Sequence, residues 1–253
     1  MLAEPGVTLA FAALIGVGIG FLGGLLGKGG SAIATPLLHA IGVPAIIAVA
    51  SPLPATIPST LIASYAYARE RLVDWRVVRW SIGFGVPATA LGAFLTRWIS
   101  GGALVRITDV ILIGLGLRLI FGTAGQPGAD RDAKVVSTLL LASLASGVGF
   151  VSGLLANAGG FLLAPLFITV LRLPIKRALA SSLAVASVLA VPGTIVHAAL
   201  GHIDWTLVVV FGSTAVPLSF IGARVAMRTD PHRLERIYGA ALIVLGTVFL
   251  IIS

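Results

Sequence analysis

Long apolar blocks alternate with short polar connections along almost the whole chain. The blocks cover residues 7–43, 46–67, 80–96, 104–122, 136–171, 178–201, 206–226 and 237–252. A helix needs about 20 apolar residues to cross a bilayer, so the blocks 7–43 and 136–171 are too long for one crossing. Both are interrupted by small residues, GGLLGKGG and GLLANAGG. Irregular backbone is tolerated at membrane depth only where protein or water surrounds it. We therefore predict a broken or re-entrant helix in each long block.

Composition places the chain in the membrane class. Of 253 residues, 58% are hydrophobic and 10% are charged, and the mean hydropathy is +1.08. We predict an all-α polytopic membrane protein with roughly 8–10 transmembrane segments, whose partner is the lipid bilayer. The net charge of +8 does not indicate nucleic-acid binding, because the basic residues lie in short clusters between apolar segments. The absence of cysteine excludes thiolate metal sites and cysteine nucleophiles, and we predict no cofactor and no metal.

The two halves of the chain match each other at a regular spacing. Gly24-Leu25-Leu26 recurs as Gly153-Leu154-Leu155, and Asp74-Trp75 recurs as Asp204-Trp205. Further matches at nearly the same offset join Gly30 to Gly159, Pro36 to Pro165, Ala50-Ser51 to Ala180-Ser181, Pro87 to Pro217 and Arg106 to Arg236. Such self-similarity indicates duplicated units. We predict a first membrane repeat at residues 1–125 and a second at 134–253, joined by a cytoplasmic linker at 126–133.

The distribution of Lys and Arg predicts that the two repeats have opposite orientations. If every block crosses once, the two sides carry about seven and nine basic residues. If each long block instead returns to its own side, fourteen lie on one side, and the other side keeps only Arg97 and Arg106. The second arrangement follows the rule that cytoplasmic loops are rich in Lys and Arg. It makes the chain an inverted repeat, an architecture common among secondary transporters.

The two glycine-rich breaks are the predicted binding site. Short helices that begin after the breaks would point their positive dipole ends at a ligand, which favours an anion. Lys28 adds a charge in a block with no acidic partner, and Asn157 stands at the matching position. The candidate substrate-binding residues are Lys28, Gly29, Gly30, Ser31, Asn157, Gly159, Gly160, Ser51, Ser181 and Ser182.

Each of these features also has a purely structural interpretation. Glycine-rich segments often serve helix packing, and Lys28 could extend to the membrane surface. The hydroxyls of Ser51, Ser181 and Ser182 could bond to their own helix backbone. For His197 and His202, near the end of the block 178–201, an interfacial role is favoured over a proton relay.

The motif GFLGGLLGKGGSAIATPLL, its echo GFVSGLLANAGGFLLAPLF and the paired Asp-Trp resemble the TauE/SafE sulfite exporter family. The resemblance covers nearly the whole chain. It implies a multi-pass transporter of the prokaryotic inner (plasma) membrane for small anions such as sulfite or an organosulfonate like sulfoacetate. The family commonly has an aliphatic residue where Lys28 and Asn157 stand, and GTSL where this chain has ASPL and ASSL, so the particular substrate is open.

Three classes of function remain to be compared. We favour a carrier that exports a small anionic substrate by alternating access. An anion channel built on the same repeat and a transporter of a small carboxylate are the alternatives. An intramembrane serine protease is disfavoured, because GFVSG has the wrong spacing and no histidine lies at a depth that matches Ser152. The chain is therefore predicted not to be an enzyme, and a homo-oligomer is left open.

Overall fold

A computed structural model describes residues 5–27, 31–95, 138–154 and 159–252. All regular structure in these ranges is helical. The helices are α1 (Pro5–Leu26), α2 (Ser31–Ala40), α3 (Ala45–Ala50), α4 (Pro52–Arg69), α5 (Trp75–Leu95), α7 (Thr138–Leu154), α8 (Gly160–Thr169), α9 (Ile175–Ala199), α10 (Trp205–Arg228) and α11 (Pro231–Ile252).

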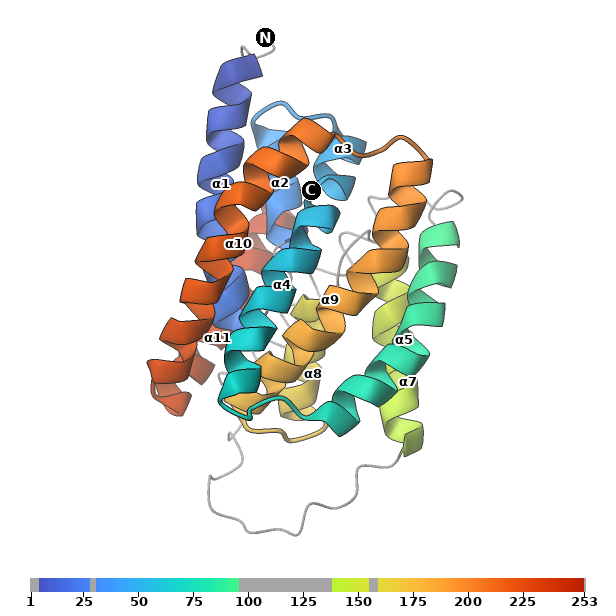
Figure 1. The fold of residues 1–253 in the computed structure, drawn as a ribbon, viewed down its shortest axis with the longest axis vertical. Coiled ribbons are helices and arrows are strands. Elements are labelled where there is room, and N and C mark those ends of the chain that lie inside the picture. The colour runs from blue at the N-terminus through green and yellow to red at the C-terminus, as the bar shows by residue number, and fades with distance from the viewer. Residues whose placement is uncertain (1–4, 28–30, 96–137, 155–158, 253) are drawn as a thin grey trace.

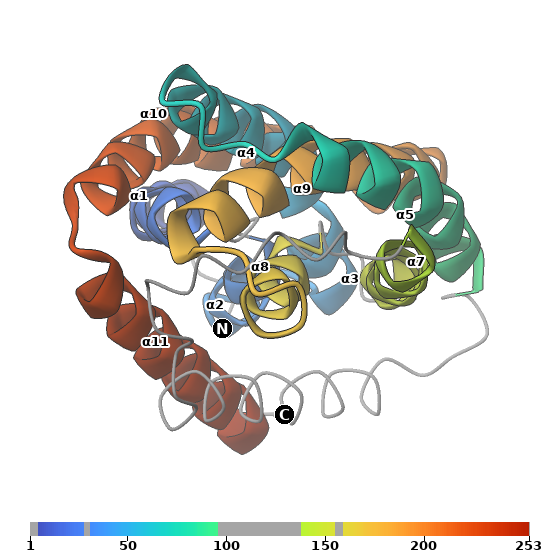
Figure 2. The same cartoon turned by 90° about the horizontal axis from the view of Figure 1, so that it is seen from below.

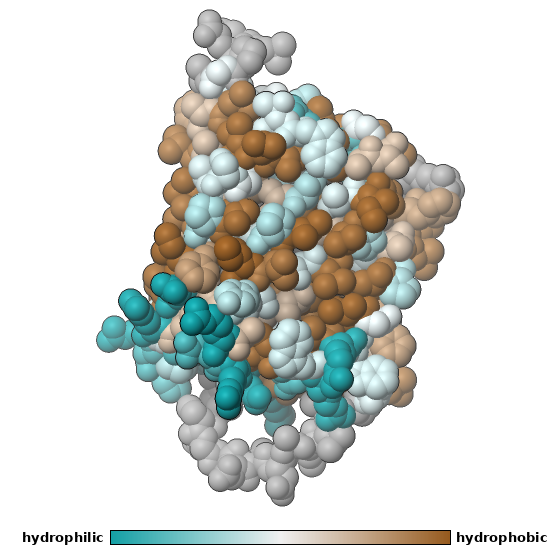
Figure 3. Space-filling view, in the orientation of Figure 1, coloured by the Kyte–Doolittle hydropathy of each residue, from teal (hydrophilic) through white to brown (hydrophobic). Residues whose placement is uncertain are grey.

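Five helical stretches in the described ranges are long and apolar enough to cross a membrane. They are Thr8–Leu26, Ile46–Arg69, Trp75–Leu95, Ile175–Ala199 and Trp205–Arg228. On the face that Figure 3 shows, apolar side chains predominate in the middle, and strongly hydrophilic ones gather at one end. Trp75 and Trp205 begin α5 and α10 and are more than half exposed, as expected of aromatic residues at a membrane surface. The prediction of an all-α polytopic membrane protein is confirmed.

Every Lys and Arg of the described ranges lies at that hydrophilic end, which we call the basic end. These residues belong to the α4–α5 connection, the α8–α9 connection and the region where α10 gives way to α11. The opposite end carries the N-terminus, the α2–α3 connection and the α9–α10 connection (Figure 1). We call it the far end.

Each long apolar block folds back toward the end where it began. Helix α1 runs from the far end toward the basic end, and α2 returns to the far end. Helix α7 runs from the basic end, and α8 returns to it (Figure 1). Seen along the long axis, α2 and α8 lie beside α4 and α9, between α1 on one side and α7 on the other (Figure 2). The returning helices are therefore enclosed by longer ones.

The two halves pack on each other through reciprocal glycine contacts. Helix α1 lies against α10, and α7 lies against α5. A Cβ added at Gly24 would overlap the carbonyl oxygen of Ser219, and one at Gly153 would overlap that of Thr89. In the opposite direction, Gly222 abuts α1 and Gly92 abuts α7. Glycine lets helix backbones approach closely, so each half supplies the packing surface of the other.

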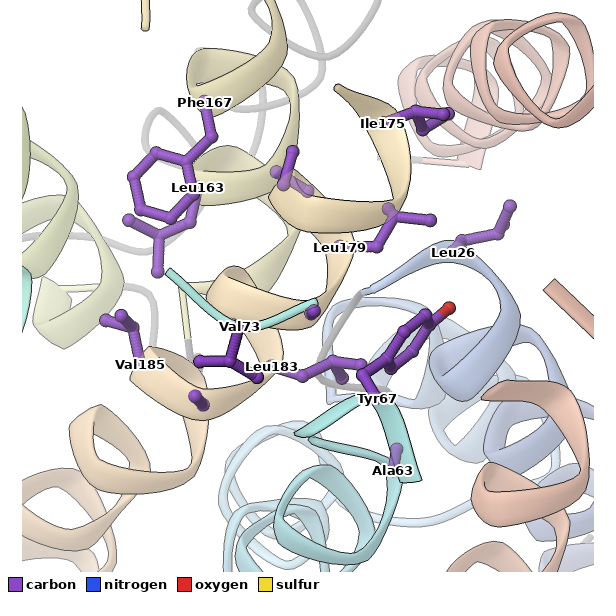
Figure 4. Packing of buried hydrophobic residues seen from close by; sticks show 14 of the residues in the cluster. Leu26, Ala63, Tyr67, Val73, Leu163, Phe167, Ile175, Leu179, Leu183 and Val185 are labelled. Carbon is purple, nitrogen blue, oxygen red and sulfur yellow. The ribbon is translucent and has the colours of Figure 1, made fainter. Parts of the chain in front are cut away.

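Helices α4 and α9 cross at the centre and carry most of the core. One buried cluster joins Tyr67 on α4 to Leu179 and Leu183 on α9, and extends to Leu26 and to Leu163 on α8 (Figure 4). All five side chains are at most 1% exposed. The Tyr67 hydroxyl is the one polar group among these five side chains. That hydroxyl donates to the carbonyl oxygen of Gly24 over 3.4 Å. The core therefore ties the end of α1 to both central helices.

Candidate functional site

The second glycine break starts a helix near the middle of the membrane. Gly159 has φ +73°, a conformation that glycine adopts without strain, and it caps α8. A Cβ at Gly159 would lie 2.5 Å from the Oγ of Ser152 and 3.5 Å from Leu189, the fifteenth of the 25 residues of α9. Helix α8 has 10 residues and is about 15 Å long, half the hydrocarbon thickness of about 30 Å. It therefore spans only the half of the membrane next to the basic end.

The first break packs directly against α9. Gly27 has φ +65°, and an added Cβ there would lie 2.9 Å from the Cα of Leu179. The hydroxyl of Ser182 donates to the carbonyl oxygen of Gly27 over 3.0 Å and to that of Leu179 over 2.9 Å. Helix α2 begins at Ser31 and, like α8, has 10 residues. Ser182 is thus the predicted site serine that contacts a break.

The electrostatics of this region favour negative ligands. Helices α2 and α8 both begin after a break, where the first-turn N–H groups have no partner inside the helix and the positive dipole end lies. Within the described ranges, the acidic residues are Glu70, Asp74, Asp204, Asp230 and Glu235. The first four lie in connections between helices, and Glu235 is the fifth residue of α11, so all lie at the two ends. In the described part, no carboxylate therefore opposes an anion at membrane depth.

Ser51 and Ser181 are part of a reciprocal link between the halves. The Oγ of Ser181 accepts from the backbone N–H of Asp74 over 2.9 Å, and the Oγ of Ser51 accepts from that of Asp204 over 3.0 Å. Both serines are at most 1% exposed. Each aspartate also caps its helix, and Asp204 accepts from Thr206 and Leu207. These two hydroxyls thus hold the start of α5 and of α10 in place.

A small crevice lies beside the first break. It has a volume of about 10 Å³, enough for about one water molecule, and is bounded by α1, α4, α9 and α10. Its lining includes Thr56, Ser59, Thr60 and Ser219, together with Gly23, one turn before Gly27. The four hydroxyls donate to backbone carbonyl oxygens: Thr56 to Pro52, Ser59 to Ala55, Thr60 to Thr56 and Ser219 to Ser59. The crevice therefore presents hydroxyl oxygens whose protons are already engaged.

A larger hollow of about 320 Å³ opens at the far end. It is lined by Thr8, Leu9, Val43, Pro44, Ile47, Asp204, Thr206 and Leu207. Asp204 brings a carboxylate to its wall, which disfavours an anion there. The geometry of the breaks, with two half-membrane helices inside a bundle of longer ones, is more typical of a transport site.

The model of the sulfite exporter TauE/SafE family matches residues 12–249. The chain belongs to the TauE/SafE family. A probable membrane transporter protein of Xylella fastidiosa (strain 9a5c) is 30% identical over 230 residues, which cover 89% of this chain and 88% of that protein. The probable membrane transporter proteins YjnA of Bacillus subtilis (strain 168) and MJ0441 of Methanocaldococcus jannaschii are 24% and 22% identical, with 92% and 94% of this chain covered, and 96% and 94% of theirs. No solved structure matches significantly.

As a member of the TauE/SafE family, this chain is a membrane transporter. The residues predicted for its site fall into three groups in the structure. Lys28, Gly29, Gly30 and Asn157 lie outside the described residues. Ser31 begins α2, Gly159 and Gly160 begin α8, and Ser182 contacts the first break. Ser51 and Ser181 bond to the opposite half. The site therefore remains a prediction that the described backbone accommodates at both helix starts.

Two features of this TauE/SafE protein went beyond the sequence interpretation. Ser51 with Ser181 and Asp74 with Asp204 were matched as repeats, but the sequence gives no signal that each serine bonds to the aspartate of the other half. His197, expected at an interface, is only 2% exposed, and its Nδ1 lies 3.2 Å from the Nδ1 of His202. His197 is thus buried at the end of α9, where the chain turns back into α10, and its interfacial role stays a prediction.

Proposed function

We propose that this protein is a carrier that exports a small anion, such as sulfite or an organosulfonate like sulfoacetate, by alternating access. The observation that carries the proposal is a pair of half-membrane helices, α2 and α8, that lie inside the bundle and begin just after the two glycine-rich segments of the sequence. Their positive ends suit an anion, and the described acidic side chains lie away from them. The sulfite exporter name of the family supports the substrate class.

The binding set of the proposal is the pair of breaks. Lys28 supplies the positive charge and Asn157 a neutral hydrogen-bonding group, and the amides that follow them complete the set. Ser182 fixes the first break by its hydrogen bond to Gly27. An anion with several oxygen atoms, such as a sulfite or sulfonate group, can accept from many donors at once.

Alternating access follows from the proposed inverted repeat. The reciprocal packing of α1 on α10 and α7 on α5, and the reciprocal links from serine to aspartate, support two oppositely oriented repeats. The basic end would be cytoplasmic in a prokaryotic inner membrane. Since the chain lacks cysteine, single substitutions Arg71→Cys and His202→Cys can be labelled from either side. Labelling of both from the same side would overturn this topology.

Export is favoured by the membrane potential. With a negative cell interior, one negative charge that moves outward gains about 2.3 kcal/mol per 100 mV. Because the described residues place no carboxylate at membrane depth to carry a coupling ion, this gradient alone is the simplest driving force.

The proposal is tested by removal of the charge at the first break. We expect Lys28→Met to lower the initial rate of sulfite or sulfoacetate flux in proteoliposomes at least about tenfold, which is the scale of one lost charge-assisted hydrogen bond. The matched control is Lys176→Met, because Lys176 lies at the basic end and donates to the carbonyl oxygen of Met227. Its flux should stay within about twofold of the unaltered protein.

Two outcomes would contradict the proposal. Undiminished binding and flux in Lys28→Met would remove this residue from the site. Single-channel currents without counterflow of labelled substrate would indicate a channel, since a carrier exchanges substrate across the membrane one turnover at a time.

A further inference from the structure

A buried histidine pair closes the far end of α9. His197 lies in the last turn of α9, and His202 lies in the connection to α10. Their Nδ1 atoms are 3.2 Å apart and their ring centroids 5.4 Å. His197 is 2% exposed, whereas His202 is only partly buried and its neighbour Gly201 is exposed. The pair thus joins the surface at the far end to the protein interior.

The inner atom of this pair has no hydrogen-bond partner in the described structure. The Nε2 of His197 is fully buried and unpaired. The hydroxyls of Thr194, one turn earlier on α9, and of Ser152, beside Gly159, are also buried and unpaired. Buried polar groups nearly always have a partner, so a set of unpaired ones calls for an explanation such as a transient ligand. All three belong to the second half of the chain, and Ser152 immediately precedes its glycine-rich segment GLLANAGG.

The contact between the two Nδ1 atoms has defined proton chemistry. Two neutral imidazoles can share it only if one nitrogen carries a hydrogen and the other does not. If His202 donates, the remaining hydrogen of His197 lies on Nε2 and points into the interior. One further proton can then bind to the Nε2 of His202 without breaking the contact. A second further proton would place two N–H groups face to face, so the pair has room for one.

Among the described residues, few other charged groups lie at the end of the molecule that holds this pair. The elements packed against α9 are α4, α5, α8 and α11, and the Lys, Arg, Asp and Glu residues described on them lie at the basic end. At the far end, the described charged group nearest in the chain is Asp204, whose carboxylate accepts from two N–H groups of α10. Tyr65 on α4 is exposed. In the first half, Tyr67 and Leu72 stand at the positions that match His197 and His202. The described structure has its histidine pair at one face of the membrane.

We propose that the His197–His202 pair is a proton-binding site at the far end, and that its proton and the transported anion bind cooperatively. The anion in this inference is the substrate of the proposed function, so the inference rests on that function. A charged imidazole is costly in a buried place unless a negative charge offsets it, and an intramembrane histidine is a common proton carrier in transporters. By linkage, an anion that strengthens proton binding is itself bound more tightly when the proton is present.

The proton site can be tested without any transport. The chain has four histidines, so the imidazole signals of histidine-labelled protein in detergent can be assigned by substitution. Sulfoacetate is a suitable probe, because its charge is constant between about pH 6 and 8. We expect saturating sulfoacetate to move the midpoint of the pair's titration upward by about one pH unit, which corresponds to about tenfold coupling. His39 is an exposed histidine at the same end and should not respond.

Flux measurements provide the second readout. Sulfoacetate flux of the unaltered protein should depend on the pH at the far end, and His197→Asn or His202→Asn should flatten this dependence, whereas His39→Asn should keep it. The proposal would be overturned if His197→Asn and His202→Asn lowered the flux equally at every pH or left its pH profile unchanged. It would also be overturned if sulfoacetate did not change the titration midpoint of the pair. If no flux occurs but sulfoacetate still shifts the titration, the proton site stands and the proposed export fails.

Discussion

The two halves of the chain pair their helices in matching ways, α1 on α10 and α7 on α5, and differ in the side chains that fill the spaces between helices. Where α4 meets α10, Ser59 leaves the hydroxyl-lined crevice open. At the matching place, where α9 meets α5, Leu189 fills the space and lies 3.0 Å from a Cβ added at Gly85. The last turns of α4 and α9 also differ, because buried Tyr67 on α4 stands at the position that matches buried His197 on α9. The helix pairings therefore match in the two halves, whereas the polar side chains at matching positions differ.

The close helix contacts teach what the halves must keep in common. Gly24 and Gly153 both abut a backbone carbonyl of the opposite half, whereas Gly18 and Gly147 have nothing within 4 Å. These four glycines occur at matching positions. The comparison thus separates glycines that packing requires from those that it does not.

The largest effect should come from the two glycines that abut a backbone carbonyl, Gly24 and Gly153. We expect Gly24→Ala and Gly153→Ala each to lower the free energy of unfolding in mixed micelles by about 3 kcal/mol or more, because a methyl group would overlap backbone rather than a movable side chain. Gly18→Ala and Gly147→Ala, as matched controls, should change it by less than about 1 kcal/mol. A large difference between Gly24 and Gly153 would break the reciprocity.

A smaller effect should distinguish the space filled by Leu189 from the crevice beside Ser59. Leu189→Ala removes a side chain that is 1% exposed and should cost about 2–5 kcal/mol. Ser59→Ala removes one hydroxyl that bonds to Ala55 of its own helix and should cost less than about 0.5 kcal/mol. Equilibrium unfolding of the two variants measures both values. Equal losses would show that the two places are filled alike.

Smaller effects than that of Leu189→Ala are expected at the links from serine to aspartate. Ser51→Ala and Ser181→Ala each leave a backbone N–H without its acceptor and should cost about 1–3 kcal/mol, by similar amounts in the two halves. Ser187→Ala is the control, because within the described residues that buried hydroxyl bonds to Ala184 of its own helix, so its removal should cost less than about 0.5 kcal/mol. Thermal unfolding in detergent compares the three.

Much of this architecture could be predicted from the sequence. The apolar blocks, the glycine breaks and the excess of basic residues at one end follow from length, polarity and the cost of charge in lipid. The family follows from motifs that occur twice. These features depend on local composition, which a single chain displays directly.

The partners of individual side chains could not be predicted in the same way. Ser181 is a plausible ligand group by its type and depth, yet its oxygen serves Asp74, 107 residues away in the chain. His197 lies near a block end and is still buried, because the following turn covers it. Such contacts depend on how helices pack in space, and helix spacing alone does not encode that.

The exchange of packing surfaces between halves has a consequence for synthesis. The partner of Gly24 is Ser219, which the ribosome adds 195 residues later. At about 5–20 residues per second, α1 waits roughly 10–40 s in the bilayer before α10 exists to cover its glycine face. During that interval the nascent first half needs lipid, an insertase or another helix as a temporary neighbour, so slow translation of the second half would expose it to misassembly.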